Sequence, residues 1–258
     1  MHDELDELAR RASASGGRLG LAVHDLGTGE RAEVDAGRVF TAASVIKLPI
    51  MMTLLSGTEA GTWSLDDRLP LAPSRRVGGA GVAAELADVP DLSVRDLLTL
   101  MIIVSDNMAT NLLIDLLGMD AVTSWCARHG MPRTVLARSM MDADARARGH
   151  ENRTTPADTA ALLTGLARGD LLGERATAHA LEVLTRQQTA DRLPRHLPGG
   201  VRLAHKTGEL DGVRHDAGIV LADGRAPIVI VVLTEGFADE DHAADLVAEA
   251  GRVVYTVL

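Results

Sequence analysis

Ser44 and Lys47 are the first residues of this chain whose types and spacing could do chemistry. Three positions apart on a helix, they would lie one turn apart on the same face, where the amine can reach the hydroxyl. A serine hydroxyl is a weak nucleophile until a neighbour takes its proton. Lysine can do this only as a neutral amine, with its pKa lowered by burial or by a nearby cation. Because this spacing also occurs by chance in many helices, it needs support from elsewhere in the chain.

The scarcity of lysine gives that support. The sequence has 26 lysines and arginines, and only Lys47 and Lys206 are lysines. Arginine serves wherever a solvated positive charge is enough, but it stays protonated in proteins, whereas lysine can release its proton. Lys206 begins the motif Lys206-Thr207-Gly208, and Ser105-Asp106-Asn107 lies between the two lysines. We therefore expect chemical roles for both amines, against the alternative that two lysines remain by accident.

These three motifs, in this order, resemble the serine β-lactamase and penicillin-binding protein superfamily, most closely the class A β-lactamases. The resemblance extends from about Leu19 to the C-terminus, because the order of the expected helices and strands also fits. It implies a covalent acyl-enzyme on Ser44, with Lys47 as the base or as the group that orders Ser44. Ser105 would relay a proton to the leaving atom. Lys206 would help to keep Lys47 neutral.

The resemblance also implies how substrate is held. Asn107 would bind the acyl-side amide, and Lys206 with Thr207 would bind a carboxylate. Gly208 would leave room for the substrate beside its strand. The backbone N–H of Glu209 would be the second oxyanion donor, beside that of Ser44. Arg214 is a candidate second partner for the carboxylate, and a solvated surface arginine is an equally good interpretation.

One family element is missing. Class A enzymes carry Glu-Pro-x-x-Asn in a long loop, where the glutamate and asparagine hold the water that releases the acyl group. Here Asn152-Arg153-Thr154-Thr155-Pro156 resembles the exit of that loop, but no earlier proline precedes it within the loop, and Glu151 stands too close to the exit. Asp142 or Asp144 could replace the missing glutamate as the group that activates this water. The sequence therefore supports acylation better than hydrolysis.

The overall composition is that of a globular enzyme with a small-molecule substrate. At 258 residues with 46% apolar but only 2% aromatic residues, the core must be built from aliphatic side chains and methionine. The net charge of −10 argues against nucleic acid as a partner. The single Cys126 excludes an internal disulfide and fits a buried, inert thiol. No histidines are spaced as metal ligands, so we expect no metal and no cofactor.

The ends and partners give further expectations. The acidic start of the chain lacks the basic and apolar regions of a secretory signal, and no apolar run is long enough to span a bilayer. We expect a cytoplasmic protein as given, or a secreted one if a leader was removed. We also expect a monomer without a membrane partner.

Strand patterns occur only near the two ends, and helical patterns fill the middle. This order predicts an α/β (α+β), two-lobed fold of β-lactamase or transpeptidase type: an antiparallel sheet of about five strands flanked by the terminal helices, with an inserted all-helical lobe. Residues 1–40 and 190–258 would form the sheet lobe and 41–189 the helical lobe, with the active site in the cleft between them. We expect helices over 3–14, 44–55, 93–104, 108–117, 121–129, 155–168, 174–188 and 238–258, strands over 19–23, 31–34, 202–206, 215–221 and 227–234, and an ordered loop over 133–155.

Three functions fit these expectations. The leading interpretation is a serine acyl-hydrolase that hydrolyses β-lactams. The second is an acyltransferase or esterase of a natural-product pathway, in which another nucleophile accepts the acyl group. The third is a penicillin-binding, receptor-like module that is acylated without turnover.

Overall fold

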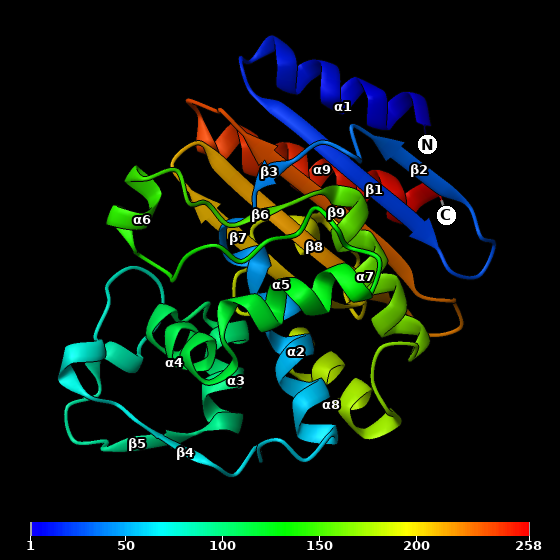
Figure 1. Ribbon diagram of the computed structural model, residues 1–258. Helices are drawn as coiled ribbons and strands as arrows, with labels where there is room; N and C mark the ends of the chain where they lie inside the picture. Colours follow the sequence, from blue (N-terminus) through cyan, green and yellow to red (C-terminus); the bar gives the residue numbers. More distant parts are fainter. Residues whose placement is uncertain (1, 258) are drawn as a thin grey trace.

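The two ends of the chain build one five-stranded antiparallel sheet, as the sequence predicts. The computed structural model describes residues 2–257, and its main sheet has the order β2-β1-β9-β8-β7. Strands from the start and the end of the chain therefore lie side by side (Figure 1). The strands are β1 (Arg18–Asp25), β2 (Arg31–Val34), β7 (Arg202–Leu210), β8 (Val213–Leu221) and β9 (Ile228–Glu235).

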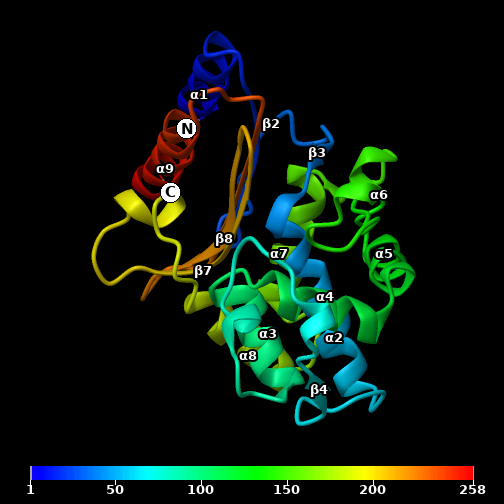
Figure 2. The ribbon, with the colours of Figure 1, turned by 90° about the vertical axis from the view of Figure 1, so that its left-hand side faces the viewer.

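Both faces of this sheet are covered. The terminal helices α1 (His2–Ala14) and α9 (Glu240–Val257) pack on one face, and the remaining helices lie on the other (Figure 2). The central strand β9 is buried along nearly its whole length. Its uninterrupted apolar sequence is what a strand with both faces covered requires.

The helical part is centred on α2 (Lys47–Glu59), in which every residue from Lys47 to Leu55 is buried. This matches a helix that is apolar on nearly all sides, because neighbours surround it. Two short strand pairs complete this part: β3 (Phe40–Thr41) with β6 (Arg153–Thr154), and β4 (Arg68–Pro70) with β5 (Asp91–Ser93). The other helices are α3 (Val94–Ile103), α4 (Asn107–Leu117), α5 (Met119–Arg128), α6 (Ala143–Ala147), α7 (Pro156–Arg168) and α8 (Glu174–Thr185).

The structure differs from the expected elements in two places that matter for the site. Strands β7 and β8 run on into a tight hairpin at Asp211-Gly212, where Gly212 has a φ of +70°. Glycine adopts this conformation without the steric cost that a side chain would add, so Gly212 suits the second central position of the turn. The loop over 133–155 contains α6 and β6. The division into lobes at residues 40/41 and 189/190 stays a prediction. Within residues 2–257, no helix is both long and apolar enough to cross a membrane.

His215 joins three strands behind the site. Its Nε2 donates to the Thr41 carbonyl of β3 at 2.8 Å, and its Nδ1 accepts from the Thr234 N–H of β9 at 3.0 Å. The ring also meets Phe40 edge-on. With Nδ1 as an acceptor and Nε2 as a donor, both ring nitrogens are satisfied only in the neutral form. Burial lowers the pKa of His215 to about 4, with a smaller lowering contribution from the charge of Arg192.

This buried histidine predicts an acid-sensitive fold. An unfolded histidine has a pKa near 6.5, so the unfolded chain binds more protons than the folded one between about pH 4 and 6.5, and the free energy of unfolding rises with pH across that window. The full contribution at neutral pH is about 3 kcal/mol. The free energy of unfolding, measured with urea at pH 4.5 and at pH 7, should differ less between the two pH values in His215→Asn than in the wild type. His24 and His179 titrate in both proteins, so an unchanged difference would contradict this role for His215.

Candidate active site

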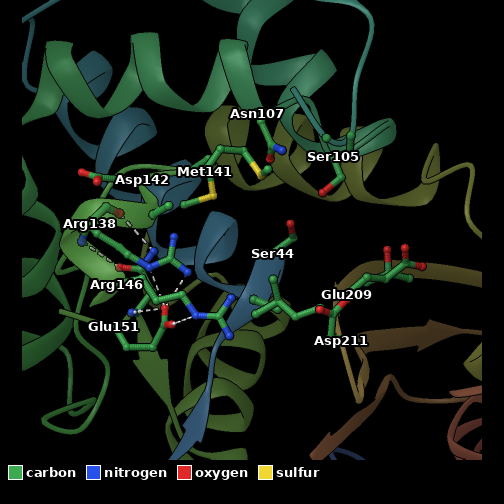
Figure 3. A pocket seen from close by; sticks show the side chains of 18 of the residues that line it. Ser44, Ser105, Asn107, Arg138, Met141, Asp142, Arg146, Glu151, Glu209 and Asp211 are labelled. Atoms are coloured by element: carbon green, nitrogen blue, oxygen red, sulfur yellow. Dashed lines mark hydrogen bonds and ion pairs between the residues drawn. The ribbon is translucent and has the colours of Figure 1, made fainter. Parts of the chain in front are cut away.

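A pocket of about 450 Å³ lies where β7 meets the helical part (Figure 3). Its walls come from the turn at the start of α2, the turn between α3 and α4, the segment 79–80, the long loop and the end of β7. Five of the residues to which the resemblance gives catalytic or substrate-binding roles line this pocket: Ser44, Ser105, Asn107, Thr207 and Glu209.

Ser44 lies in a single 3₁₀ turn, η1 (Ala43–Ile46), that leads directly into α2. The turn packs closely against β7, since a Cβ added to Gly208 would lie 3.2 Å from the Cβ of Ala43. Ser44 is half-buried. Within residues 2–257 its hydroxyl makes no hydrogen bond, so it faces the pocket without a competing protein partner.

Both lysine amines are completely buried, and both contact the hydroxyl of Ser105. The Nζ of Lys47 lies 3.0 Å from Ser105 Oγ, 2.7 Å from the Ser105 carbonyl oxygen and 3.0 Å from Asn107 Oδ1. The Nζ of Lys206 lies 3.1 Å from the same Ser105 Oγ and 2.9 Å from the Thr207 carbonyl oxygen. The spacing of Ser44 and Lys47 predicts that the Lys47 amine reaches the Ser44 hydroxyl. The hydrogen bonds of Lys47 and Lys206 instead meet at Ser105, in the pocket that Ser44 faces.

Two ammonium groups cannot both be stable this close together without water. Burial, and then the charge of Lys206, lower the pKa of Lys47 well below its usual value, while Asp106 opposes the shift. Burial, with a smaller contribution from Arg192, lowers the pKa of Lys206 to about 7, against the opposing charge of Asp216. Burial and the neighbouring amine therefore favour the neutral form of Lys47, and the pKa of about 7 places the change in charge of Lys206 near neutral pH.

Asp106 fixes the turn that carries Ser105. Its Oδ1 accepts the Ala109 N–H at 2.8 Å and so caps α4, and its Oδ2 accepts the N–H groups of Val82 and Ala83 at 2.6 and 2.7 Å. One buried carboxylate thus caps α4 and also ties the Ser105 turn to the separate loop that contains Val82 and Ala83.

The glycine-rich segment 78–81 forms one rim of the pocket, where Gly79 and Ala80 line it. At least one of its glycines is required by the close approach of the chain to Asp106. Gly81 has a φ of +112°, and a Cβ at this position would lie 2.3 Å from Asp106 Cγ. The segment also orients Asn107, whose Nδ2 donates to the Gly78 carbonyl at 3.1 Å and whose N–H donates to the Ala80 carbonyl at 2.9 Å.

Backbone strain is concentrated around this pocket. In the described chain four non-glycine residues have positive φ, and three of them line the pocket: Ala43 at +44°, Ser105 at +55° and Met141 at +62°. Such conformations cost of the order of 1–3 kcal/mol each and persist only where the surroundings enforce them. Their clustering is therefore independent evidence for a functional site.

The long loop presents no unengaged carboxylate to Ser44. Asp142 lines the pocket, but its Oδ1 caps α6 by accepting a backbone N–H at 2.8 Å. Its carboxylate points away from Ser44, and Met141 lies between them (Figure 3). Asp144 is exposed and is not among the residues that line the pocket.

Glu151, the acidic residue near the exit of the long loop, stabilises the loop through ion pairs. Glu151 pairs with Arg138 at 2.7 Å and with Arg146 at 3.5 Å. Asn152 closes the loop, because its Oδ1 accepts the N–H groups of Ala137 and Arg138 at 2.8 and 3.0 Å. These contacts show that Glu151 and Asn152 stabilise the exit of the loop.

Arg214 lies outside the lining of the pocket, and several lining residues were missed by the sequence analysis. The Arg214 guanidinium pairs with Glu240 and donates to the Val213 carbonyl at 2.8 Å. The Asp211-Gly212 turn signal could have placed the end of β7 at the pocket. Nothing local in the sequence marks the remaining missed residues, which include Arg138, Met141 and Thr189.

Comparisons with known proteins agree with this geometry. A β-lactamase from Streptomyces fradiae is 33% identical over 248 residues, which cover 92% of this chain and 80% of that protein. The crystal structure of a β-lactamase from Sphaerobacter thermophilus superposes with a TM-score of 0.92 at 32% identity, covering 99% of this chain and 97% of the other. PBP-A superposes with a TM-score of 0.90 at 27% identity, covering 99% and 96%.

The family itself follows from the whole chain. The model of the β-lactamase enzyme family matches residues 2–258, and class A β-lactamase structures share the fold. The chain belongs to the β-lactamase enzyme family.

Proposed function

We propose that this protein is a serine acyl-hydrolase of the class A β-lactamase type that forms a covalent acyl-enzyme on Ser44. The observation that carries the proposal is the pair of buried amines on the Ser105 hydroxyl, in the pocket that Ser44 faces. The substrates would be β-lactams or other amides and esters that bear a carboxylate. One chain supplies the whole pocket, which supports action as a monomer on small molecules.

The contacts of Lys47 define a proton path. A neutral amine has two N–H groups and one lone pair. The Ser105 carbonyl oxygen and Asn107 Oδ1 can only accept, so they take both N–H groups. The lone pair then faces Ser105 Oγ, whose O–H donates to Lys47 while Lys206 donates to the same oxygen. The resting site is thus a chain of donors from Lys206 through Ser105 to Lys47.

This chain accounts for acylation. When Ser105 turns its O–H toward the leaving atom of the substrate, the Lys47 lone pair becomes available. Ser44 then gives its proton to Lys47 as its Oγ bonds to the acyl carbon. The backbone N–H groups of Ser44 and Glu209 would receive the negative charge on the acyl oxygen. Ser105 protonates the leaving atom and is reprotonated from the amines, and Asn107 keeps one free Nδ2–H for the acyl-side amide.

Release of the acyl group from Ser44 is a separate step from acylation. The side chains that the long loop presents to the pocket favour a second candidate function in which this step is slow. Release needs a base that activates water, whereas the loop presents Met141 and a carboxylate that is turned away. A structural relative, a PBP-A mutant, is described as an acyl-enzyme complex with penicillin G. The second candidate is therefore a protein whose acyl-enzyme persists, as a receptor-like module or as an acyltransferase that awaits an amine or alcohol.

A chromogenic cephalosporin, followed by colour and by intact mass, tests acylation and distinguishes the two candidates. We expect the wild type to gain the mass of one acyl group, and Ser44→Ala to gain none and to lose at least about 1,000-fold in rate, because the nucleophile is gone. Steady colour release supports hydrolysis, and a one-equivalent burst with a lasting adduct supports the second candidate. The exposed Ser74→Ala is the matched control. Acylation of Ser44→Ala at the wild-type rate would end the proposal.

The pKa of Lys206 predicts a pH-dependent preference for carboxylate-bearing substrates. Since the pKa is about 7, the protonated fraction falls about tenfold from pH 6 to pH 8. The ratio of kcat/KM for a penicillin to that for its methyl ester should fall as the pH rises through 7, and Lys206→Ala should remove this dependence. A ratio that is constant with pH, or equal losses on both substrates in Lys206→Ala, would show that Lys206 does not bind the carboxylate.

A further inference from the structure

The long loop places a guanidinium without a strong protein partner in the pocket. Arg146 belongs to the short helix α6 and lines the pocket. Its Nε lies 3.5 Å from Glu151 Oε2, and within residues 2–257 its two terminal NH2 groups make no hydrogen bond. The side chain is 59% exposed and extends from the loop into the pocket, on the side where Ser44 lies (Figure 3). Both terminal NH2 groups can therefore donate to a ligand in the pocket.

The carboxylate nearest to Arg146 is already engaged by another arginine. Glu151 Oε1 accepts from the Arg138 Nε at 2.8 Å and lies 2.7 Å from the Arg138 NH2. The Arg138 side chain is only 9% exposed, so its charge depends on this partner more than the exposed charge of Arg146 does. Two guanidinium groups thus face one carboxylate, and the loop wall of the pocket carries an excess positive charge.

The other carboxylates that line the pocket leave this charge in place. Asp142 caps α6 through its Oδ1, and its carboxylate lies away from the Arg146 guanidinium (Figure 3). Glu209 pairs with Arg192, and Asp211 lies beside Glu209 at the end of β7, on the opposite side of the pocket. The excess positive charge therefore lies on the loop side, and the negative charges lie at the end of β7.

A substrate bound at Ser44 would direct its acyl substituent toward the loop side. In the proposed acylation, the carboxylate on the leaving-group side of the substrate binds at Thr207. The acyl substituent is attached to the other side of the carbonyl carbon, so it extends away from β7. Figure 3 shows Ser44 between Glu209 of β7 and Arg146 of the long loop. A substituent that extends away from β7 therefore enters the space beside Arg146.

We propose that Arg146 is a specificity-determining residue that binds an anionic group on the acyl side of the substrate. The preferred acyl donors carry two anionic groups, one on each side of the bond that breaks. This inference rests on the proposed function and refines its substrate class. A guanidinium can donate two parallel N–H bonds to one carboxylate, which adds direction to the attraction between the charges. Because Arg146 is exposed, the preference is modest and depends on salt.

The test compares benzylpenicillin with its α-carboxy derivative, because the two differ only by a carboxylate on the acyl side chain. The measured quantity is the ratio of the second-order rate constants for acylation of Ser44, α-carboxy derivative over benzylpenicillin. In Arg146→Gln this ratio should fall about fivefold, the upper range for loss of an exposed charged pair. Arg146→Lys keeps the charge and should restore part of the ratio. Any general effect of the substitution on the loop changes both rate constants alike and cancels.

Salt provides a second readout that a merely structural role of Arg146 would not change. Added salt should lower the ratio in the wild type, because ions screen an exposed charge, and should leave it unchanged in Arg146→Gln. An unchanged ratio in Arg146→Gln, or the same salt dependence in both proteins, would overturn the inference.

Arg148→Gln is the matched control. Arg148 follows the same short helix, is exposed and is not among the residues that line the pocket. This variant removes the same charge from the same loop and should leave the ratio within about 1.5-fold of the wild type. A fall equal to that of Arg146→Gln would mean that the total charge of the loop sets the preference, and would overturn direct binding by Arg146.

A binding measurement separates this inference from the proposed function. In the Ser44→Ala background, NMR titration gives the dissociation constants of both penicillins without any acylation. Adding Arg146→Gln should weaken binding of the α-carboxy derivative about fivefold and leave that of benzylpenicillin unchanged. Failure of Ser44 to be acylated in the wild type would refute the proposed function alone. Unchanged binding of the α-carboxy derivative in the double variant would refute the inference alone.

Discussion

Two amines that are cut off from water share one hydroxyl, and the rest of the site depends on that contact. Each ammonium group would be costly to bury alone, and two in contact with the Ser105 oxygen would also repel each other. The arrangement is stable when Lys47 gives up its proton. Burial and the second lysine therefore both favour the neutral form of Lys47, which is the form that can act as a base.

Two residues near that contact have strained backbone conformations, and hydrogen bonds and close packing from neighbouring elements stabilise them. Ser105 and the residue before Ser44 both have left-handed backbone conformations, which a non-glycine residue adopts only under constraint. Asp106 secures the first by accepting three backbone N–H groups. The second is secured from two sides: His215 bonds the carbonyl of Thr41, two residues before Ala43, and Gly208 of β7 lies close against Ala43. Asp106 and His215, which hold the strained backbone in place, are therefore not themselves among the residues expected to react, such as Ser44 and Ser105.

The sequence predicts the sheet and the central helix well, because these depend on local patterns: alternating apolar strands and a helix apolar on all sides. It fails where a role depends on distant partners. Nothing near Arg192 in the chain indicates that it pairs with Glu209. The expected strand ended at Lys206, whereas the antiparallel pairing with β8 extends it to Leu210. The meeting of both amines at Ser105 likewise depends on the turn between α3 and α4, a tertiary feature.

Acylation and release are assigned to different parts of the molecule. The contacts of the two amines join α2, the α3–α4 turn and β7, whereas the long loop contributes a separate wall of the pocket. That loop is held by its own contacts, Glu151 with Arg138 and Asn152 with the backbone, and none of these touches the amines. Residues such as Met141 and Asp142 can therefore change without disturbing the Ser105 contact. The contacts around Ser105 and those within the long loop are therefore structurally independent of each other.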